Sequence, residues 1–463
     1  MKFSVLTLGC DKNTVDSERM VATLVGHGAE HTHDPADAEV LIVNTCGFID
    51  AAKEESIDTL LEAARLKNDG RLLVLVAVGC LVEYYRDELR RSIPEVDLLL
   101  GLRDLPDLVP QLVIRGLLDE RPHRHPGARL PVGGLRHVSY LKVSEGCDHG
   151  CSFCAIPLWR GRHRSFDPAA LVEEARALEA RGVVELNLVA QDLAHYGRDL
   201  TAGAGLHDLL VQLLQHTEIP WFRLLYIYSA GLRPALVELM AREDRLLPYI
   251  DMPIQHASTR MLELMRRPER PDVLRDKIAW LRSQIPDLTI RTTVLVGFPG
   301  ESEEDFEALL DFIGEIEFDH LGALAYSPQP GTPGAEMPNP LPESVKLERL
   351  ALVGELQRSI VAARNAARIG TTVEVLVDRL AEAGDGEPQA EARMRSQAIE
   401  IDGLTYLSES NVVLAPGDLA LATVTNADDA DVWAVPASVV RPAHRPFERQ
   451  EASALDLKTA WGR

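Results

Sequence analysis

The first third of the chain alternates between short apolar runs and longer amphipathic segments. The apolar runs cover residues 3–10, 39–46 and 72–80, and they are rich in Val, Leu and Ile without the alternation of a half-exposed strand. Helix-like segments at residues 14–28 and 51–68 lie between them. This β-α-β-α-β order predicts a doubly wound parallel sheet, whose ligand crevice lies at the carboxyl ends of its strands.

A second series of strand-like runs begins after a Pro- and Arg-rich segment. Helical segments separate these runs, which predicts a closed or partly closed parallel β/α barrel. The runs lie at residues 137–146, 183–192, 221–229, 249–257, 289–298 and 320–329. A long helical segment at residues 343–370 follows them, and Gly370 is the expected C-cap of that helix.

Towards its end the chain changes to short alternating runs with Gly and Asp turns. These runs, at residues 371–380, 397–408, 417–427 and 431–438, predict a small antiparallel β-barrel. The expected fold class is therefore α/β with this barrel appended. The expected units are an α/β domain (1–120), a linker (121–132), a β/α barrel (133–369), the small β-barrel (370–442) and a tail (443–463). We interpret His123 and His125 in the linker as solvated side chains rather than metal ligands.

Charge narrows the class of partner. The chain has 463 residues, with 71 acidic against 48 basic side chains and a net charge of −23. Residues 371–440 alone carry thirteen Asp or Glu against three Arg. Such a surface repels nucleic-acid phosphate and attracts basic partners. Neither a membrane-spanning run nor a signal peptide is expected, so the predicted location is the cytoplasm.

The six cysteines fall into two groups of three: Cys10, Cys46 and Cys80, and then Cys147, Cys151 and Cys154. In a reducing cytosol, cysteines more often bind metal or take part in catalysis than form disulfides. Each member of the first group follows an apolar run. Neighbouring strands lie about 4.8 Å apart, so the three thiols can converge at one sheet edge. Three buried structural cysteines are the alternative.

The second group forms a C-x3-C-x2-C loop after the first strand of the predicted barrel. Zinc would need a further ligand, and only His149 lies within the loop. A four-iron cluster held by three cysteines leaves one iron open to a small molecule. With Phe153 before its last cysteine, the loop resembles the signature of the radical S-adenosylmethionine (radical SAM) superfamily. That resemblance implies a [4Fe-4S] cluster whose open iron binds S-adenosylmethionine, and a 5′-deoxyadenosyl radical that abstracts hydrogen from carbon.

The same resemblance implies cofactor contacts at other strand ends. The expected positions are Gln191, Gln255, Gly297 and Glu301, with Asp192, His256 and Gly300 beside them. The alternative for the segment around Glu301 is a turn before a helix capped by Ser302. No catalytic side chain is assigned.

The whole chain except its tail resembles the methylthiotransferases, whose terminal barrel is the TRAM domain. The resemblance implies that Cys10, Cys46 and Cys80 hold an auxiliary [4Fe-4S] cluster that carries the sulfur. One S-adenosylmethionine then supplies a methyl group and a second supplies the radical, so that C–H becomes C–S–CH3. A reductant such as a flavodoxin or ferredoxin is the implied electron donor.

Within that family, "TLGCDKNTVDSE" (7–18) resembles the RimO branch, which modifies the β-carbon of an aspartate in ribosomal protein S twelve. Residues 154–165 and 251–258 resemble the same branch, although Asp11 replaces an expected proline. The tRNA-base (MiaB-like) branch is the alternative, and the acidic terminal barrel disfavours it. A non-catalytic iron-sulfur ribosome-assembly factor and a thiol-redox protein are the other hypotheses.

Four polar residues lie next to the two cysteine groups: Asn13, Asp16, Arg160 and Arg162. We expect Asp16 to cap a helix that begins near Ser17. Arg160 can bind a cofactor or substrate carboxylate bidentately, or it can be structural.

Overall fold

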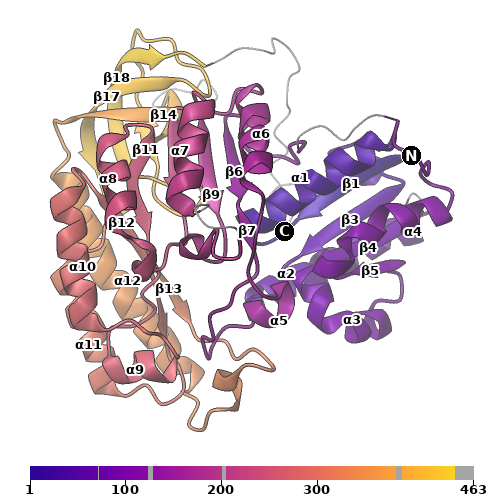
Figure 1. Cartoon of the computed structure of the whole chain (residues 1–463), viewed down its shortest axis with the longest axis horizontal. Helices are drawn as coiled ribbons and strands as arrows, with labels where there is room; N and C mark the ends of the chain where they lie inside the picture. Colours follow the sequence, from indigo (N-terminus) through magenta and orange to yellow (C-terminus); the bar gives the residue numbers. More distant parts are fainter. Residues whose placement is uncertain (71, 124–128, 201–204, 382–387, 444–463) are drawn as a thin grey trace.

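The computed structural model describes residues 1–70, 72–123, 129–200, 205–381 and 388–443. It contains an N-terminal α/β unit, a central unit with a curved sheet, and a small β-barrel that lies at one end of the central sheet (Figure 1). No helix in these ranges is long and apolar enough to cross a membrane. His125 and residues 444–463 of the expected tail lie outside the described residues.

The N-terminal unit is a five-stranded parallel sheet with the order β2-β1-β3-β4-β5. Its strands are β1 (Lys2–Thr7), β2 (Glu30–His31), β3 (Val40–Thr45), β4 (Val74–Gly79) and β5 (Leu98–Leu100). The helices α1 (Asp11–Gly26) and α4 (Leu108–Ile114) pack on one face, and α2 (Asp50–Asn68) and α3 (Cys80–Ser92) on the other. The doubly wound prediction is therefore confirmed. The strand order reverses between β1 and β3, which places the ligand crevice of such a sheet beside their carboxyl ends.

Local details of this unit differ from the sequence expectation. The strands β2 and β5 were missed because they are only two and three residues long. Helix α1 begins at Asp11, with Cys10 as its N-cap residue. Asp16 therefore lies inside the helix, where it is buried, and the expectation that it caps a helix near Ser17 was wrong.

The central unit has six parallel strands in the order β13-β12-β11-β10-β9-β6. These are β6 (Val138–Lys142), β9 (Glu185–Val189), β10 (Trp221–Leu224), β11 (Leu246–Asp251), β12 (Thr289–Val296) and β13 (His320–Ala325). The sheet curves but stays open between β6 and β13 in the described structure, as a partly closed barrel does. A short antiparallel pair, β7 (Ser144–Glu145) and β8 (Arg164–Ser165), flanks the loop that follows β6.

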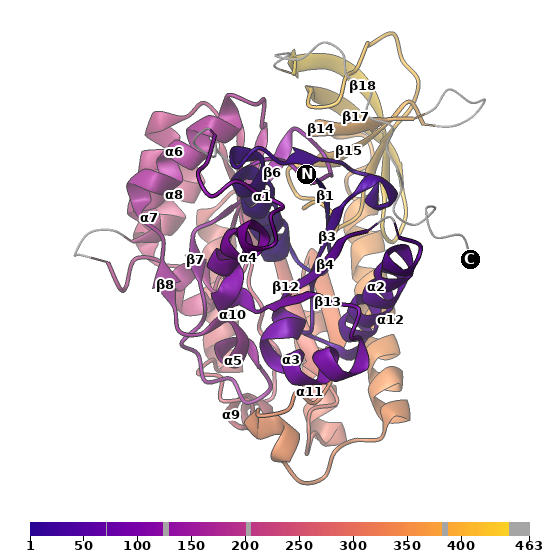
Figure 2. The ribbon, with the colours of Figure 1, turned by 90° about the vertical axis from the view of Figure 1, so that its right-hand side faces the viewer.

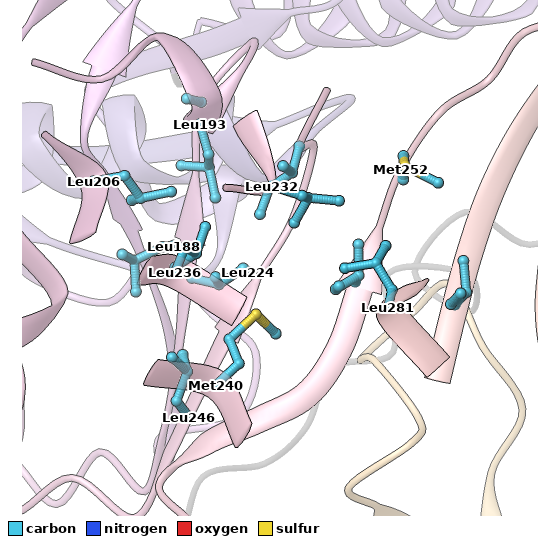
Figure 3. Packing of buried hydrophobic residues seen from close by; sticks show 14 of the residues in the cluster. Leu188, Leu193, Leu206, Leu224, Leu232, Leu236, Met240, Leu246, Met252 and Leu281 are labelled. Carbon is cyan, nitrogen blue, oxygen red and sulfur yellow. The ribbon is translucent and has the colours of Figure 1, made fainter. Parts of the chain in front are cut away.

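Helices cover the outer face of this sheet and share its largest apolar core (Figure 3). They are α6 (Pro168–Glu179), α7 (Leu206–His216), α8 (Pro234–Arg242), α10 (Pro271–Gln284), α11 (Glu303–Ile316) and α12 (Glu343–Ala366). Helix α9 (Thr259–Leu264) packs in a smaller cluster. Helix α12 ends before Gly370, which has φ +86° and donates its N–H to Val424 O, so Gly370 shapes the turn into the next unit rather than capping the helix.

The last unit is a closed five-stranded barrel with the order β14-β15-β16-β18-β17. Its strands are β14 (Thr372–Leu380), β15 (Ala390–Met394), β16 (Thr405–Leu407), β17 (Leu419–Ala427) and β18 (Val432–Arg441). The small barrel is confirmed, but it is mixed rather than purely antiparallel, because closure pairs β18 with β16 in parallel. Strand β15 was missed because it has no β-branched or aromatic residue and carries two charges, although its Arg393 is fully buried.

Buried charges join this barrel to the central sheet. The carboxylate of Glu185 on β9 pairs with Arg223 Nε at 2.7 Å and with Arg393 Nη1 at 2.6 Å, and all three side chains are completely buried. Arg393 Nε also pairs with Asp378 Oδ2 at 2.6 Å. Apolar packing between the two units surrounds this network. Since the network fixes the barrel through long-range pairs, it stabilises one relative placement of the two units.

Replacing Glu185 with Gln should destabilise the chain by about 3–5 kcal/mol, because it leaves two buried guanidinium groups short of their shared carboxylate. Thermal or denaturant unfolding would measure this loss. The matched control is Glu173→Gln, which removes an exposed pair with Arg176 and should cost less than about 1 kcal/mol. Equal stability of the two variants would contradict the prediction.

Candidate active site

The first three cysteines meet at the carboxyl edge of the N-terminal sheet. Cys10 follows β1 as the N-cap of α1, Cys46 follows β3, and Cys80 is the first residue of α3. Burial, with smaller contributions from the thiols of Cys10 and Cys46, raises the pKa of the Cys80 thiol to about 12, although Arg160 acts to lower it. The three cysteines therefore lie along one edge of the sheet.

Two glycines allow the segments that carry these cysteines to lie close together. Gly9 has φ +88°, and a Cβ there would come within 2.7 Å of Cys46 Sγ. Gly79 has φ +103°, and a Cβ there would overlap the carbonyl oxygen of Thr45. A side chain at either position would push the thiol-bearing segments apart.

The second group lies on the loop after β6, before helix α5 (Ile156–Arg160). Cys147 Sγ accepts a hydrogen bond from His149 N at 3.4 Å, and Cys154 N donates to Cys151 O at 3.2 Å. Burial raises the pKa of Cys147 to about 11 and that of Cys154 to about 12, and neighbouring thiols of the loop add to both shifts. The loop thus gathers its three thiols at the carboxyl end of the central sheet.

His149 is engaged away from these thiols. Its Nε2 lies 2.9 Å from Asp192 Oδ2, and its ring stacks on His195 at 4.3 Å and on Tyr228 at 3.9 Å between centroids. The Tyr228 hydroxyl in turn lies 3.3 Å from Cys151 Sγ. This arrangement argues against His149 as the fourth ligand of a zinc site in the loop. Neither Tyr228 nor His195 was expected at the site from the sequence, although Tyr228 lies near the end of the apolar run at residues 221–229.

A buried charged group lies between the two sets of cysteines. Its members are Asn13, Asp16, Lys142, Glu145, Arg160 and Gln191, and we call it the bridging cluster. Arg160 donates to both oxygens of Glu145 at 3.0 and 3.2 Å, and Lys142 Nζ donates to Glu145 Oε2 at 2.7 Å. Burial acts to raise the pKa of Glu145, but Lys142 and Arg160 outweigh it and lower that pKa to about 2. Glu145 is therefore an anion that holds two cations between the triads.

The residues expected to contact the cofactor have different surroundings. Gln191 Nε2 donates to Glu145 Oε1 at 3.1 Å, while its buried Oε1 has no hydrogen-bond partner in the described part of the chain. Gln255 has φ +68°, and its backbone bonds to Thr293 and Leu295 on β12. Both glutamines lie at strand ends, with Gln191 in the bridging cluster.

The segment that contains Gly297 and Glu301 makes the contacts of a turn that leads into a capped helix. The Glu301 side chain is fully buried, accepts from Phe298 N at 3.1 Å and pairs with Arg349 Nη1 at 2.8 Å. Ser302 caps α11 in a capping box with Asp305. These contacts favour the turn interpretation for the Glu301 carboxylate. Gly297, with φ +75°, packs against Lys346.

The remaining polar residues near the triads fall into two groups, those inside the bridging cluster and those outside it. Asn13, Asp16 and Arg160 belong to the bridging cluster, whereas Arg162 is 93% exposed and contacts Asp148 at 3.4 Å. His256 is buried, and its Nδ1 accepts from Ala257 N and Ser258 N. Among these residues, Asn13, Asp16 and Arg160 are therefore the ones that join the two units.

Two sets of three soft thiolate donors, each without a fourth cysteine, fit iron-sulfur clusters with one open iron. Residues next to the two sets meet at the boundary between the units. Helix α3, which begins with Cys80, packs on α5, and Cys80, Ala155 and Trp159 share an apolar cluster. Figure 2 shows the N-terminal unit in front of the central sheet, with α3 and α5 adjacent.

Comparisons with known families agree with this division of the chain. Residues 2–101 match the uncharacterized protein family UPF0004, residues 141–313 match the radical SAM superfamily, and residues 369–436 match the TRAM domain. The match to TRAM falls on the closed barrel.

Curated relatives match over nearly the full length. The chain is 46% identical over 431 residues to the ribosomal protein uS12 methylthiotransferase RimO of Anaeromyxobacter sp. (strain K), covering 92% of this chain and 91% of the relative. It is 45% identical over 442 residues to the protein of the same name from Desulforudis audaxviator (strain MP104C), covering 94% and 96%.

Solved structures support the fold alone. The radical S-adenosylmethionine methyltransferase TsrM from Kitasatospora setae aligns with TM-score 0.55 and 14% identity, covering 72% of this chain and 75% of that one. The cobalamin-dependent S-adenosylmethionine radical enzyme OxsB aligns with TM-score 0.50 and 10% identity, covering 77% and 56%.

Proposed function

Because the chain belongs to the RimO family of ribosomal protein uS12 methylthiotransferases, which are radical SAM enzymes, we propose that it replaces a hydrogen on the β-carbon of a uS12 aspartate with a methylthio group. The observation that carries this proposal is the pair of cysteine triads, whose neighbouring helices α3 and α5 pack on each other. One triad alone would suit radical chemistry but would leave no place for a sulfur donor.

The proposal assigns each triad a cluster. Cys147, Cys151 and Cys154 would hold the [4Fe-4S] cluster that binds S-adenosylmethionine, and Cys10, Cys46 and Cys80 the auxiliary one. When bound, these groups supply the radical that removes hydrogen from carbon and the methylated sulfur that replaces it. A second S-adenosylmethionine would supply the methyl group, and a flavodoxin or ferredoxin would supply electrons.

The chain's own residues position these groups and exclude water. Gln191 offers a buried, unpaired amide oxygen at the carboxyl end of β9, where it can accept from the amino group of S-adenosylmethionine. The Tyr228 hydroxyl lies against Cys151, and Gln255 and Gly297 follow neighbouring strands. Trp159 is buried beside Cys80, where it would help to exclude water from the cluster on the first triad.

Charge supports a protein substrate over tRNA. The terminal barrel and its turns carry thirteen acidic residues against three arginines, which repel phosphate and suit a basic ribosomal protein. We therefore propose that the enzyme acts in the cytoplasm, where ribosomal proteins are made, and that tRNA is not its substrate.

Anaerobically reconstituted enzyme should convert uS12 when S-adenosylmethionine, a reductant and a sulfur source are supplied. Mass spectrometry of uS12 peptides should find a methylthio group in place of one hydrogen on a single aspartate. Parallel reactions with tRNA should give no product. If tRNA is modified and uS12 is not, the proposed substrate is wrong. If no 5′-deoxyadenosine forms on reduction, the hypothesis of a non-catalytic assembly factor is favoured.

A further inference from the structure

Arg160 belongs to the central unit, but its guanidinium lies against the first cysteine triad. It is the last residue of α5, six positions after Cys154. Its Nη2 donates to Asn13 Oδ1 at 2.7 Å, and Asn13 lies one helical turn beyond Cys10. Trp159, its neighbour in α5, packs with Cys80 in one apolar cluster, so the guanidinium lies beside the segments that carry Cys10 and Cys80.

The placement of Arg160 is rigid. Its side chain is 1% exposed and bound at both ends, because Glu145 of its own unit holds Nη1 while Asn13 of the other unit holds Nη2. Asn13 is fixed in turn, since its Nδ2 donates to Leu8 O at 2.8 Å and to Thr45 O at 3.2 Å. The adjacent Trp159 is buried with Cys80. A planar fork with several donors can make these contacts together, and a lysine cannot.

The charges around Arg160 balance only while it is present. The bridging cluster contains two cations, Lys142 and Arg160, and two carboxylates, Asp16 and Glu145. Loss of Arg160 would leave one carboxylate uncompensated beside the thiolates of the first triad. Hydrogen bonds to cluster sulfurs and nearby charge are two of the levers that set the reduction potential of an iron-sulfur cluster.

We propose that Arg160 is a positioning residue of the central unit that sets the reduction potential of the auxiliary cluster and holds that cluster against the radical-generating loop. This inference rests on the proposed function, because it requires a cluster on Cys10, Cys46 and Cys80. A cation close to a cluster stabilises the more negative, reduced state. Arg160 therefore raises the auxiliary potential, and its loss lowers it.

The test isolates the auxiliary cluster in the full-length chain. In a background with Cys147, Cys151 and Cys154 all replaced by Ala, the auxiliary cluster should be the one reconstituted. Its midpoint potential is measured by a redox titration followed by electron paramagnetic resonance. Arg160→Gln should move that potential to lower values. The control Arg162→Gln removes an exposed arginine two residues away and should leave the potential unchanged.

If the Arg160→Gln variant does not fold, the Arg160→Lys variant provides a second test. Lysine keeps the charge but loses the fork, so it should lower the potential by a smaller amount. In the unsubstituted cysteine background, Arg160→Gln should reduce methylthiolated product about 10- to 100-fold, as loss of partners around metal ligands does.

The outcomes separate this inference from the function on which it rests. Failure of the background variant to bind an iron-sulfur cluster overturns the assignment of the first triad, and the role of Arg160 with it. An intact auxiliary cluster whose potential is the same with Arg, Gln or Lys at position 160 overturns the role of Arg160 alone. An equal shift in Arg162→Gln would do the same, because it would show a general charge effect.

Discussion

Replacing Cys147, Cys151 or Cys154 with Ala should abolish formation of 5′-deoxyadenosine from S-adenosylmethionine. Each thiol is one of three donors on a single loop that gathers them at the carboxyl end of the central sheet. Mutating even the outer partners of metal ligands typically costs about 10- to 100-fold, so loss of a ligand should cost more than about 100-fold. Chromatography of the reduced reaction mixture measures the product.

The matched control for this loop is Asp148→Asn. Asp148 is partly exposed, and its side chain contacts Arg162 and the backbone of His163 on the surface. It should therefore keep 5′-deoxyadenosine formation within about twofold of the parent, as a change to an exposed ion pair of low energy would. Substantial 5′-deoxyadenosine from any of the three alanine variants would refute the assignment of this loop.

Replacing Cys10, Cys46 or Cys80 with Ala should stop methylthiolation of uS12 without stopping formation of 5′-deoxyadenosine. These thiols lie on the other unit, so the radical-generating loop keeps all of its donors and 5′-deoxyadenosine should still form. Methylthiolated uS12 should fall to background, because the auxiliary cluster loses a ligand. Iron content should drop by about half, since one of two four-iron clusters is lost.

The two sets of variants control for each other. A general loss of folding would remove both 5′-deoxyadenosine and methylthiolated uS12. The assignment instead requires that first-triad variants lose methylthiolated uS12 alone and that second-triad variants lose both products. Product formed at the parent rate by a first-triad variant would mean that those cysteines are the buried structural residues of the alternative hypothesis.

Many of the elements that carry these cysteines could be predicted from the sequence. The long apolar runs became β1, β3 and β4, and the six later runs became the central sheet, because strands buried on both faces are rich in Val, Leu and Ile. The weak points were elements without that signal. Strand β15 has no β-branched or aromatic residue, and its buried Arg393 is neutralised by Asp378 on the neighbouring strand and by Glu185, which lies far away in the sequence.

In the candidate site, too, local features could be predicted from the sequence and long-range contacts could not. The spacing of Cys147, Cys151 and Cys154 is local, so the sequence alone identifies the loop and the chemistry that such a loop supports. The role of Asp16 was misjudged because the helix begins five residues before it, and its carboxylate faces Lys142 and Arg160 of the other unit. No local pattern in residues 7–18 could have indicated those partners.

By itself, the sequence determined the strand-end positions of the six cysteines, the order of the three units and the family. Only the tertiary structure decided that Asn13 meets Arg160 where the two units pack, and that Glu145 holds the cations there. The physical reason is that periodicity reports which face of an element is buried, a property of neighbouring residues. Which charges compensate one another depends instead on how separately folded units pack, and that is fixed by contacts between residues more than a hundred positions apart.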